Sequence, residues 1–374
     1  MPAADRRRLL EQLWWDAVDA VGGQRAVSSA LETDPVARPT RILAVGKAAN
    51  GMAEGALAQF PDTPTLVVTK HGHATDTLRA LPCVTVIESA HPVPDAHSIA
   101  AGHALLDAMH ATAADDHVLL LVSGGASALA EALPDGWTLD DLQALNTEML
   151  ASGLAIGEMN RRRRATSRIK GGKLVAASQC PVTVLALSDV EGDAIDTIGS
   201  GIGDPAGQPG CTVRLVASNR IARARAADAA IAAGLTVLEN TEGLYDDVFA
   251  LAARLGPALA TASPGVHIFG GEPTVVLPPT PGRGGRNQAL ALALAEHIAT
   301  LPHISVLVAG TDGSDGPTGD AGGVVDGDTW RDGAQAALEA ADAGTFLSAC
   351  GGLFTTGPTH TNVMDLAIAI VEPR

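Results

Sequence analysis

The segment Arg41-Ile42-Leu43-Ala44-Val45-Gly46-Lys47-Ala48-Ala49-Asn50-Gly51 has the pattern of a buried strand, a glycine turn and the start of a helix. The same alternation of short β-branched runs and alanine-rich helical segments continues along the chain. Strands separated by helix-length segments are typical of parallel βαβ units, so we predict an α/β protein with a doubly wound parallel sheet. After residues 41–45, the expected strands are 66–69, 84–87, 118–122, 182–187, 213–216, 235–238, 266–269, 305–308 and 366–371.

Length and composition narrow the class of protein. A chain of 374 residues with 46% hydrophobic content can bury substantial cores, and its length suggests two domains. We place the boundary near Thr241, before an expected helix at 244–255, which gives domains 1–241 and 242–374. The net charge of −17 argues against nucleic acid or an anionic membrane as the main partner, because both require excess positive charge.

Cysteine usage and hydropathy favour a reduced, cytoplasmic protein. The cysteines at 83, 180, 211 and 350 lie far apart and form no C-x-x-C pair. Arg6-Arg7-Arg8 is not followed by the apolar stretch of a signal peptide, and no run approaches the roughly 18 apolar residues of a membrane span. We therefore expect a small-molecule partner and no membrane association.

Two glycine turns are candidate anion sites. In Gly46–Gly51, Lys47 lies near the start of a helix, where free N–H groups attract anions; the alternative is a tight turn with a surface lysine. Ser123-Gly124-Gly125-Ala126-Ser127 follows strand 118–122, and its small residues allow phosphate to approach the backbone; the alternative is a close-packed turn. Neither turn is a Walker A loop or a G-x-G-x-x-G dinucleotide fingerprint.

Two further segments concentrate positive charge in an otherwise acidic chain. The run Arg161–Arg164 is typical of a solvated helix face, whereas Lys170, followed by two glycines, suits close approach to an anion. Ser167-Arg168-Ile169-Lys170 also matches the S-x-x-K string of penicillin-recognising enzymes, but the Lys-Thr-Gly partner is missing. Gly282-Arg283-Gly284-Gly285-Arg286-Asn287-Gln288 opens an expected helix at 289–297. It favours Arg286 as the ligand of a carboxylate or a transferring phosphoryl group.

Four aspartates follow predicted strands and are candidate metal ligands. Asp189 and Asp193 come after strand 182–187, and Asp312 and Asp315 come after strand 305–308. Mg²⁺ prefers one or two carboxylates together with phosphate oxygens and water, so the set favours a Mg²⁺-nucleotide site. The alternative is that they cap helices and solubilise turns. Gly199-Ser200-Gly201 lies shortly after Asp193 and offers small residues beside the carboxylates.

In this order, the motifs resemble those of the glycerate 2-kinases with a C-terminal MOFRL domain, whose members are often named hydroxypyruvate reductases. The matching strings are 45–48, 70–73, 91–95, 123–129, 167–172, 188–193, 199–201, 282–288, 311–318 and 356–363. The resemblance implies a Rossmann-like N-terminal domain and a smaller MOFRL-type α/β C-terminal domain, with the active site in the cleft between them. It also implies ATP- and Mg²⁺-dependent phosphorylation of D-glycerate at its 2-hydroxyl, giving 2-phosphoglycerate.

Residue roles follow from the motifs and the resemblance together. We expect a catalytic set of Lys47, Arg286 and Asp189. The expected nucleotide-binding set is Ser123, Gly124, Gly125, Ser127, Lys170, Gly199, Ser200 and Gly201. The expected substrate-binding set is His91, Arg283, Asn287 and Asn362. The expected metal ligands are Asp189, Asp193, Asp312 and Asp315.

The chain departs from the family pattern at four positions, and other functions stay open. His71 stands where Tyr is expected and Ala126 where Gly is expected; Ala165 replaces His and Glu191 replaces Pro, which bears on the identity of the substrate. A kinase for a related 2-hydroxy acid is one alternative. NAD(P)H-dependent reduction of hydroxypyruvate is another, although the dinucleotide fingerprint is absent. A sensor of phosphorylated acids would not need the carboxylates. A homodimer is compatible with the sequence.

Overall fold

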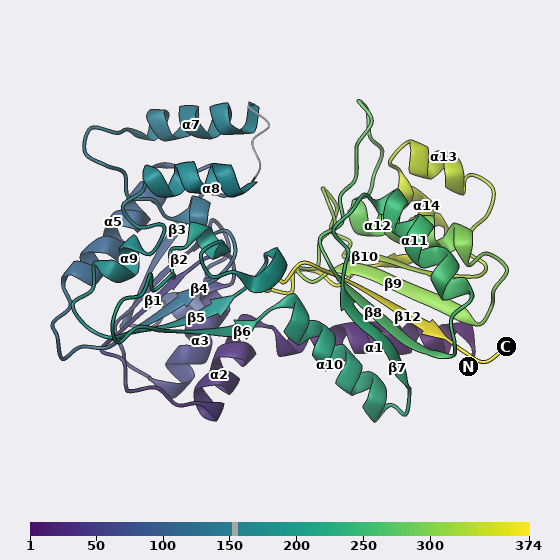
Figure 1. Ribbon diagram of the computed structural model, residues 1–374, viewed down its shortest axis with the longest axis horizontal. Coiled ribbons are helices and arrows are strands. Elements are labelled where there is room, and N and C mark those ends of the chain that lie inside the picture. Colours follow the sequence, from purple (N-terminus) through teal and green to yellow (C-terminus); the bar gives the residue numbers. More distant parts are fainter. Residues whose placement is uncertain (152–155) are drawn as a thin grey trace. The chain divides into compact units, whose positions relative to one another are not determined.

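The computed structural model describes residues 1–151 and 156–374, which form two compact units (Figure 1). The first unit is Gly22–Ser218; the second combines Met1–Val21 with Asn219–Arg374. This division differs from the boundary expected near Thr241, which lies inside strand β7 (Val237–Glu242). The reason is that β7 pairs with β8 (Gly265–Gly271) of the second unit, so the chain has already entered that unit before residue 241.

The first unit is built on a six-stranded sheet whose neighbouring strands are all parallel. Its order, β3-β2-β1-β4-β5-β6, is that of a doubly wound sheet and confirms the predicted fold class. The strand order reverses between β1 and β4, the place where such sheets bind ligands beyond the strands' carboxyl ends. The strands are β1 (Arg41–Val45), β2 (Thr65–Lys70), β3 (Val84–Ser89), β4 (Val118–Val122), β5 (Val182–Leu187) and β6 (Thr212–Ala217).

Helices cover both faces of this sheet. As a consequence, every residue of β4 and nearly every residue of β1 is buried. Leu43 and Val45 pack in one core with α5, α6 and α9. On the other side, α3 packs on β1 and β2, and α2 packs against α3. The helices are α2 (Gly23–Thr33), α3 (Ala49–Gln59), α4 (Asp76–Arg79), α5 (Ala96–His110), α6 (Ala126–Leu129), α7 (Leu139–Ala151), α8 (Ile156–Ala165) and α9 (Lys173–Ala176), with 3₁₀ turns at Glu191–Asp193 and Ile198–Ser200.

The second unit has a mixed sheet in the order β11-β10-β9-β12-β8-β7. β7 and β8 pair in parallel, whereas the other neighbours pair antiparallel, so the second, smaller α/β domain that was expected has a mixed sheet. β10 and β11 were not predicted, since one begins with two glycines and the other has two residues. The strands are β7 (Val237–Glu242), β8 (Gly265–Gly271), β9 (Ile304–Gly310), β10 (Gly322–Asp326), β11 (Leu353–Phe354) and β12 (Asp365–Val371).

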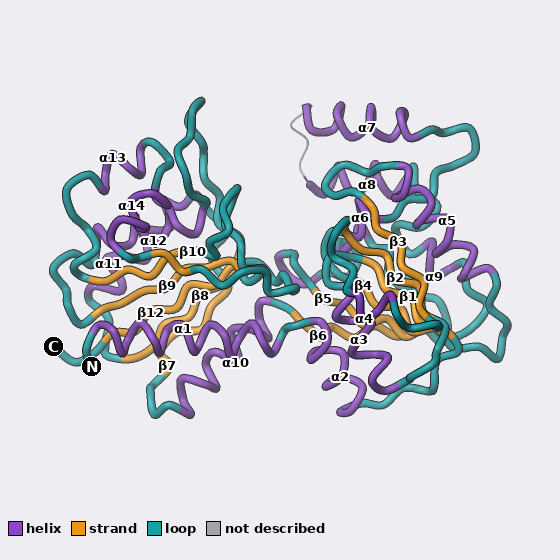
Figure 2. The backbone as a smooth tube through the Cα atoms, turned by 180° about the vertical axis from the view of Figure 1, so that it is seen from behind, coloured by secondary structure: helices purple, strands orange, loops and turns teal. Residues whose placement is uncertain are grey.

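Two groups of helices cover this mixed sheet, one on each face (Figure 2). On one face lie α1 (Ala3–Ala20) and α10 (Asn219–Ala232). On the other lie α11 (Val248–Ala260), α12 (Arg286–His297), α13 (Ala334–Glu339) and α14 (Ala343–Cys350). The helix expected at 244–255 is α11, and it begins four residues later, at Val248, after its N-cap residue Asp247. None of the helices described has the length and apolar character needed to cross a membrane.

Candidate active site

Each unit carries one cluster of polar side chains that includes residues predicted from the sequence. The glycine-loop cluster of the first unit comprises Lys47, His91, Ser123–Ser127 and Asp189. The arginine cluster of the second unit comprises Glu272, Arg286, Asp315 and Asp365, with Asn287.

In the glycine-loop cluster, the turns after β1 and β4 are joined by hydrogen bonds. The Lys47 N–H donates to the Gly124 carbonyl at 2.8 Å, and the Ala48 N–H donates to Ser123 Oγ at 3.0 Å. Gly46 has a φ of +130°, and a Cβ there would lie 2.1 Å from Ser123 Oγ, so this contact requires glycine. The Ser123 hydroxyl therefore holds the two turns together at the reversal of strand order.

Three functional side chains converge on Gly124 and Gly125. A Cβ on Gly124 would lie 1.8 Å from Asp189 Oδ2. A Cβ on Gly125 would lie 2.9 Å from Lys47 Cγ and 3.3 Å from His91 Cδ2. The turn after β4 is thus surrounded by a cation, an imidazole and a carboxylate, with bare backbone between them.

A cavity of about 370 Å³ adjoins this turn, and its wall combines charged and polar side chains with apolar ones. Burial, together with the positive charge of Lys47, lowers the pKa of His91 to about 4, so its ring is neutral at pH 7. A neutral imidazole can donate one hydrogen bond and accept another. The residues that line the cavity are His91, Pro92, Pro94, Gly125, Ser127, Ala128, Glu131, Leu142, Arg163, Thr166, Lys170 and Asp189.

A buried ion pair forms part of the cavity wall. Lys170 is 2% exposed and Glu131 is 1% exposed, and the Lys170 ammonium group binds Glu131 Oε2. The Ser167 hydroxyl donates to Glu131 Oε1 at 2.5 Å. Burial lowers the pKa of Lys170, and the carboxylate of Glu131 opposes that shift. Lys170 is therefore held by a protein carboxylate, which the sequence prediction did not include.

The segment 199–201 is hydrogen-bonded to the two glycines that follow Lys170. The N–H groups of Gly171 and Gly172 donate to the carbonyls of Ser200 and Gly201 at 3.0 and 2.8 Å, so they are not available to an anion. The hydroxyls of Ser127 and Ser200 lie 2.8 Å apart and are hydrogen-bonded. Ser127 also lines the cavity, whereas the glycines join two loops of the protein.

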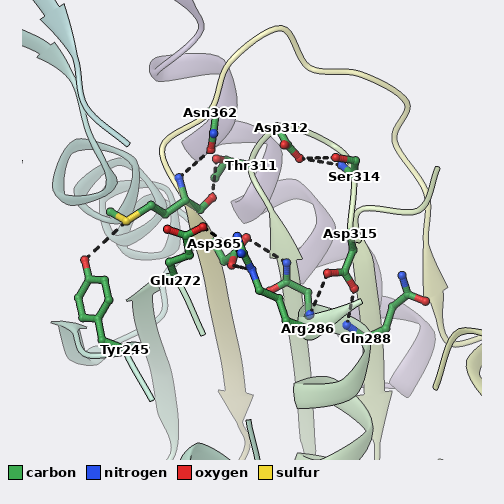
Figure 3. Close-up of polar contacts among 12 residues, drawn as sticks. Tyr245, Glu272, Arg286, Gln288, Thr311, Asp312, Ser314, Asp315, Asn362 and Asp365 are labelled. Atoms are coloured by element: carbon green, nitrogen blue, oxygen red, sulfur yellow. Dashed lines mark hydrogen bonds and ion pairs between the residues drawn. The ribbon is translucent and has the colours of Figure 1, made fainter. Parts of the chain in front are cut away.

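The arginine cluster lies where α12 begins (Figure 3). Arg286 donates from Nε to Asp365 Oδ2 at 2.7 Å and from Nη1 to Glu272 Oε1 at 2.9 Å. Burial disfavours the charge of Arg286, but Asp365 and Glu272 outweigh it and raise its pKa above the usual value. Asn287 Nδ2 donates to the other oxygen of Asp365 at 3.0 Å, which fixes the orientation of that carboxylate.

Asp315 and Asp312 are engaged by the protein in ways that oppose the metal role expected for them. Asp315, 2% exposed, accepts the backbone N–H groups of Asn287 and Gln288 at 3.0 and 2.8 Å and so caps α12. Burial raises the pKa of Asp315 to about 6 despite these bonds. Asp312 Oδ1 accepts both the N–H and the hydroxyl of Ser314 at 2.8 and 2.9 Å. Figure 3 shows both carboxylates pointing to these partners.

Comparison with known proteins identifies the family. A family model described as a domain of unknown function (DUF4147) matches residues 9–235, and the MOFRL family model matches residues 265–365. A glycerate 2-kinase from Pyrococcus horikoshii is 31% identical, covering 100% of this chain and 99% of its own length. The crystal structure of a glycerate kinase from Thermotoga maritima is 30% identical with a TM-score of 0.92, covering 98% of this chain and 100% of that chain. The chain belongs to the glycerate kinase family.

Membership of this family agrees with the resemblance of the sequence motifs, and the name hydroxypyruvate reductase also occurs among the relatives. A relative from Agrobacterium vitis, provisionally named a hydroxypyruvate reductase, is 35% identical over 98% of this chain and 94% of its own length. Glycerate kinases and proteins with the reductase name are therefore relatives of one another and of this chain.

In this glycerate kinase family member, some of the residues predicted from the sequence meet in the two clusters, and others lie elsewhere. Lys47, His91, Ser123, Gly124, Gly125 and Asp189 meet at one turn, and Arg286 and Asn287 share Asp365. Arg283 pairs instead with Asp320, and Asn362 accepts the N–H of Met364 at 3.0 Å. Asp193 lies in a 3₁₀ turn of the first unit. Sequence reasoning missed Glu131, Glu272 and Asp365, since each lies just outside a motif or in none, and pairs with a residue far away in the sequence.

Proposed function

We propose that this chain transfers a phosphoryl group from ATP, with Mg²⁺, to the 2-hydroxyl of D-glycerate and yields 2-phosphoglycerate. The observation that carries the proposal is the convergence of Lys47, His91 and Asp189 on Gly124 and Gly125 in a glycerate kinase family member. Phosphoryl transfer depends mainly on positioning and on neutralising charge, and this turn offers close backbone approach beside a fixed cation.

Within the first unit, the phosphates of the nucleotide bind at the turn after β4. The missing side chains of Gly124 and Gly125 allow phosphate oxygens to approach the backbone, and the Lys47 ammonium group offsets their charge. His91, neutral at pH 7, is suited to hydrogen bonding without adding charge.

The carboxylates differ in how well they fit a Mg²⁺ ion. Asp189 lines the cavity and lies against Gly124, so it fits the role of a ligand beside bound phosphate. Asp312, Asp315 and Asp189 all have partners within the protein, so the metal is assigned to Asp189 for its place beside Gly124 and the cavity. When bound, Mg²⁺ would neutralise charge on the phosphate oxygens.

Arg286 is proposed to bind an anionic group of the substrates. Its Nε and Nη1 are bound by carboxylates, and across the ranges described no hydrogen bond from Nη2 is found. The side chain is 33% exposed, so part of the guanidinium group reaches solvent. Asp365 and Glu272 fix its plane, which prepares the remaining N–H groups for a carboxylate or a phosphoryl oxygen.

The test is a direct assay of product and position. Purified protein is incubated with ATP, Mg²⁺ and D-glycerate, and ³¹P NMR resolves 2-phosphoglycerate from 3-phosphoglycerate. We expect 2-phosphoglycerate, and none when Mg²⁺ is removed by EDTA. Formation of 3-phosphoglycerate would contradict the assigned position, and turnover of another 2-hydroxy acid alone would contradict the assigned substrate.

A second candidate, reduction of hydroxypyruvate by NAD(P)H, is favoured by the name of the Agrobacterium vitis relative. The turn after β1, Gly46-Lys47-Ala48-Ala49-Asn50-Gly51, lacks the glycine spacing of a dinucleotide site. NADH oxidation is measured in parallel with the kinase assay. Oxidation that depends on hydroxypyruvate, without phosphorylated product, would replace the kinase proposal by the reductase.

A further inference from the structure

Three potential metal ligands from two segments meet at the surface of the first unit, outside the glycine-loop cluster. His71 follows β2, Asp95 is the N-cap residue of α5, and His97 lies in the first turn of that helix. Asp95 Oδ2 lies 3.0 Å from His71 Nε2 and 3.3 Å from His97 Nδ1. One donor atom from each of the three residues lies within 4.8 Å of the other two.

These distances suit a small divalent ion held by imidazole and carboxylate. Bonds of roughly 2.0–2.1 Å in a tetrahedral site separate neighbouring ligand atoms by about 3.3 Å. Two imidazoles and one carboxylate also form a set that favours zinc, nickel or copper over magnesium or calcium. The three side chains are 49%, 31% and 65% exposed, so an ion can enter and keep water as a fourth ligand.

Asp95 is held in place by its role as a helix cap. Its other oxygen, Oδ1, accepts the N–H and the hydroxyl of Ser98 at 2.9 and 3.1 Å. These bonds leave Oδ2 directed at the two imidazoles, as in metal sites where a surrounding contact orients a ligand. Burial would raise the pKa of Asp95, but the bonds from His71 and Ser98 outweigh it and keep the carboxylate ionised.

We propose that His71, Asp95 and His97 bind one divalent transition-metal ion, with Zn²⁺ as the representative ion. The site uses other residues than the Mg²⁺ site proposed beside Asp189. Its nitrogen ligands also suit a different class of metal. The bound ion would join the loop after β2 to the first turn of α5. The segment just before that turn begins at His91, which lines the cavity, so the ion would also anchor that segment.

The test uses the untagged full-length protein after removal of metal by EDTA. Zn²⁺ is titrated in by isothermal calorimetry, and we expect saturable binding of one ion per chain. His71→Ala and His97→Ala each remove a ligand from an exposed side chain and should weaken binding roughly tenfold or more. Asp95→Asn keeps a capping side chain and should weaken binding similarly. His103→Ala, an exposed histidine of the same helix, should bind as the wild type does.

A Co²⁺ titration distinguishes this site from the four cysteines. Visible absorption of a nitrogen and oxygen site, lost in His71→Ala, would support the proposal. Thiolate-to-cobalt charge-transfer absorption would place the ion on a cysteine and overturn it. The absence of saturable Zn²⁺ binding, or equal binding by the wild type and both histidine variants, would also overturn it.

Discussion

Gly125 shows how one missing side chain shapes the candidate active site. Its φ of +81° is strained for other residues, and a Cβ there would press on Lys47 Cγ at 2.9 Å. We expect Gly125→Ala to cost roughly 1–3 kcal/mol of stability from the backbone and to lower kinase kcat/KM by displacing Lys47 and His91. Urea unfolding and steady-state kinetics measure the two effects.

Gly136→Ala is the matched control for that substitution. Gly136 has a φ of +84° but no atom within 4 Å of an added Cβ, so it isolates the backbone strain from the clash. It should lose similar stability and keep its activity. Equal loss of activity in both variants would show that strain, rather than displacement of Lys47, explains the effect.

Lys47 is the cation proposed to offset phosphate charge, so its removal should act on the reaction more than on the fold. We expect Lys47→Ala to lower kcat/KM by roughly 10²–10³-fold, in the range found when one preorganised electrostatic group is lost. Arg25→Ala, at an exposed cation of the same unit, should have little effect. Near wild-type activity of Lys47→Ala would remove Lys47 from the proposed site.

The buried pair of Lys170 and Glu131 predicts strong coupling. Lys170→Met leaves an uncompensated buried carboxylate and should cost about 3–5 kcal/mol. In the double variant with Glu131→Gln, the loss of stability should be smaller than the sum of the losses in the two single variants. Urea unfolding of the four proteins in this double-mutant cycle measures the difference. Arg168→Met, at an exposed arginine of the same segment, should cost under about 1 kcal/mol. Additive losses in the cycle would contradict the pairing.

The sequence predicts the role of a residue when its neighbours in the sequence define that role, and not when the role depends on a distant partner. Lys47 and Gly125 stand in turns directly after strands, and the strand order brings those turns together. Glu131 and Asp365 act through partners 39 and 79 residues away, so no local pattern identifies them. Asp315 was found by its motif, but only its contacts with α12 show that it is a helix cap.

At the scale of elements, the start of α12 depends on a buried carboxylate whose pKa is raised to about 6. The folded state therefore binds this proton more tightly than the unfolded state, for which the pKa is 3.8, so this contribution to stability falls as pH rises through that window. Between about pH 5 and pH 7 we expect a loss of roughly 1 kcal/mol from Asp315.

Asp315→Asn isolates this contribution. The amide of Asn does not titrate, and its oxygen can still accept one of the two backbone N–H groups of α12, so the variant should lack the pH-dependent contribution of Asp315. The difference in stability between the wild type and the variant should then shrink as pH rises. A difference that stays constant from pH 5 to pH 7 would show that Asp315 has an ordinary pKa.

The elements themselves were predictable to different degrees in the two units. The central strands β1, β4 and β5 of the first sheet carry apolar runs buried on both faces, which gives parallel strands a clear signal. In the second unit, β10 is Gly-Gly-Val-Val-Asp and β11 is Leu-Phe, and their pairing depends on β9 rather than on their own sequence. Strand direction in that sheet likewise follows from long-range pairing.

At the scale of the molecule, α1 belongs to the second unit although it begins the chain. Leu10, Leu13 and Trp14 are buried there, and Arg6 donates to Ser305 Oγ at 3.0 Å. Removing residues 1–21 should destabilise the second unit by roughly 5 kcal/mol or more, from the loss of three large buried side chains. Hydrogen exchange should show lost protection in β9 and β12, with β1 and β4 unchanged. Equal loss in both sheets would contradict two separate cores.

The placement of α1 also has a consequence for synthesis on the ribosome. Arg6 and Ser305 are 299 residues apart, so at roughly 5–20 residues per second α1 emerges some 15–60 s before its partner strand. During that interval the first unit can fold, whereas the apolar side of α1, with Trp14, can meet at most α10, and its surface on β9 and β12 is still missing. The nascent chain is therefore exposed to aggregation at its own N-terminal helix, and a chaperone that binds apolar helices would act there first.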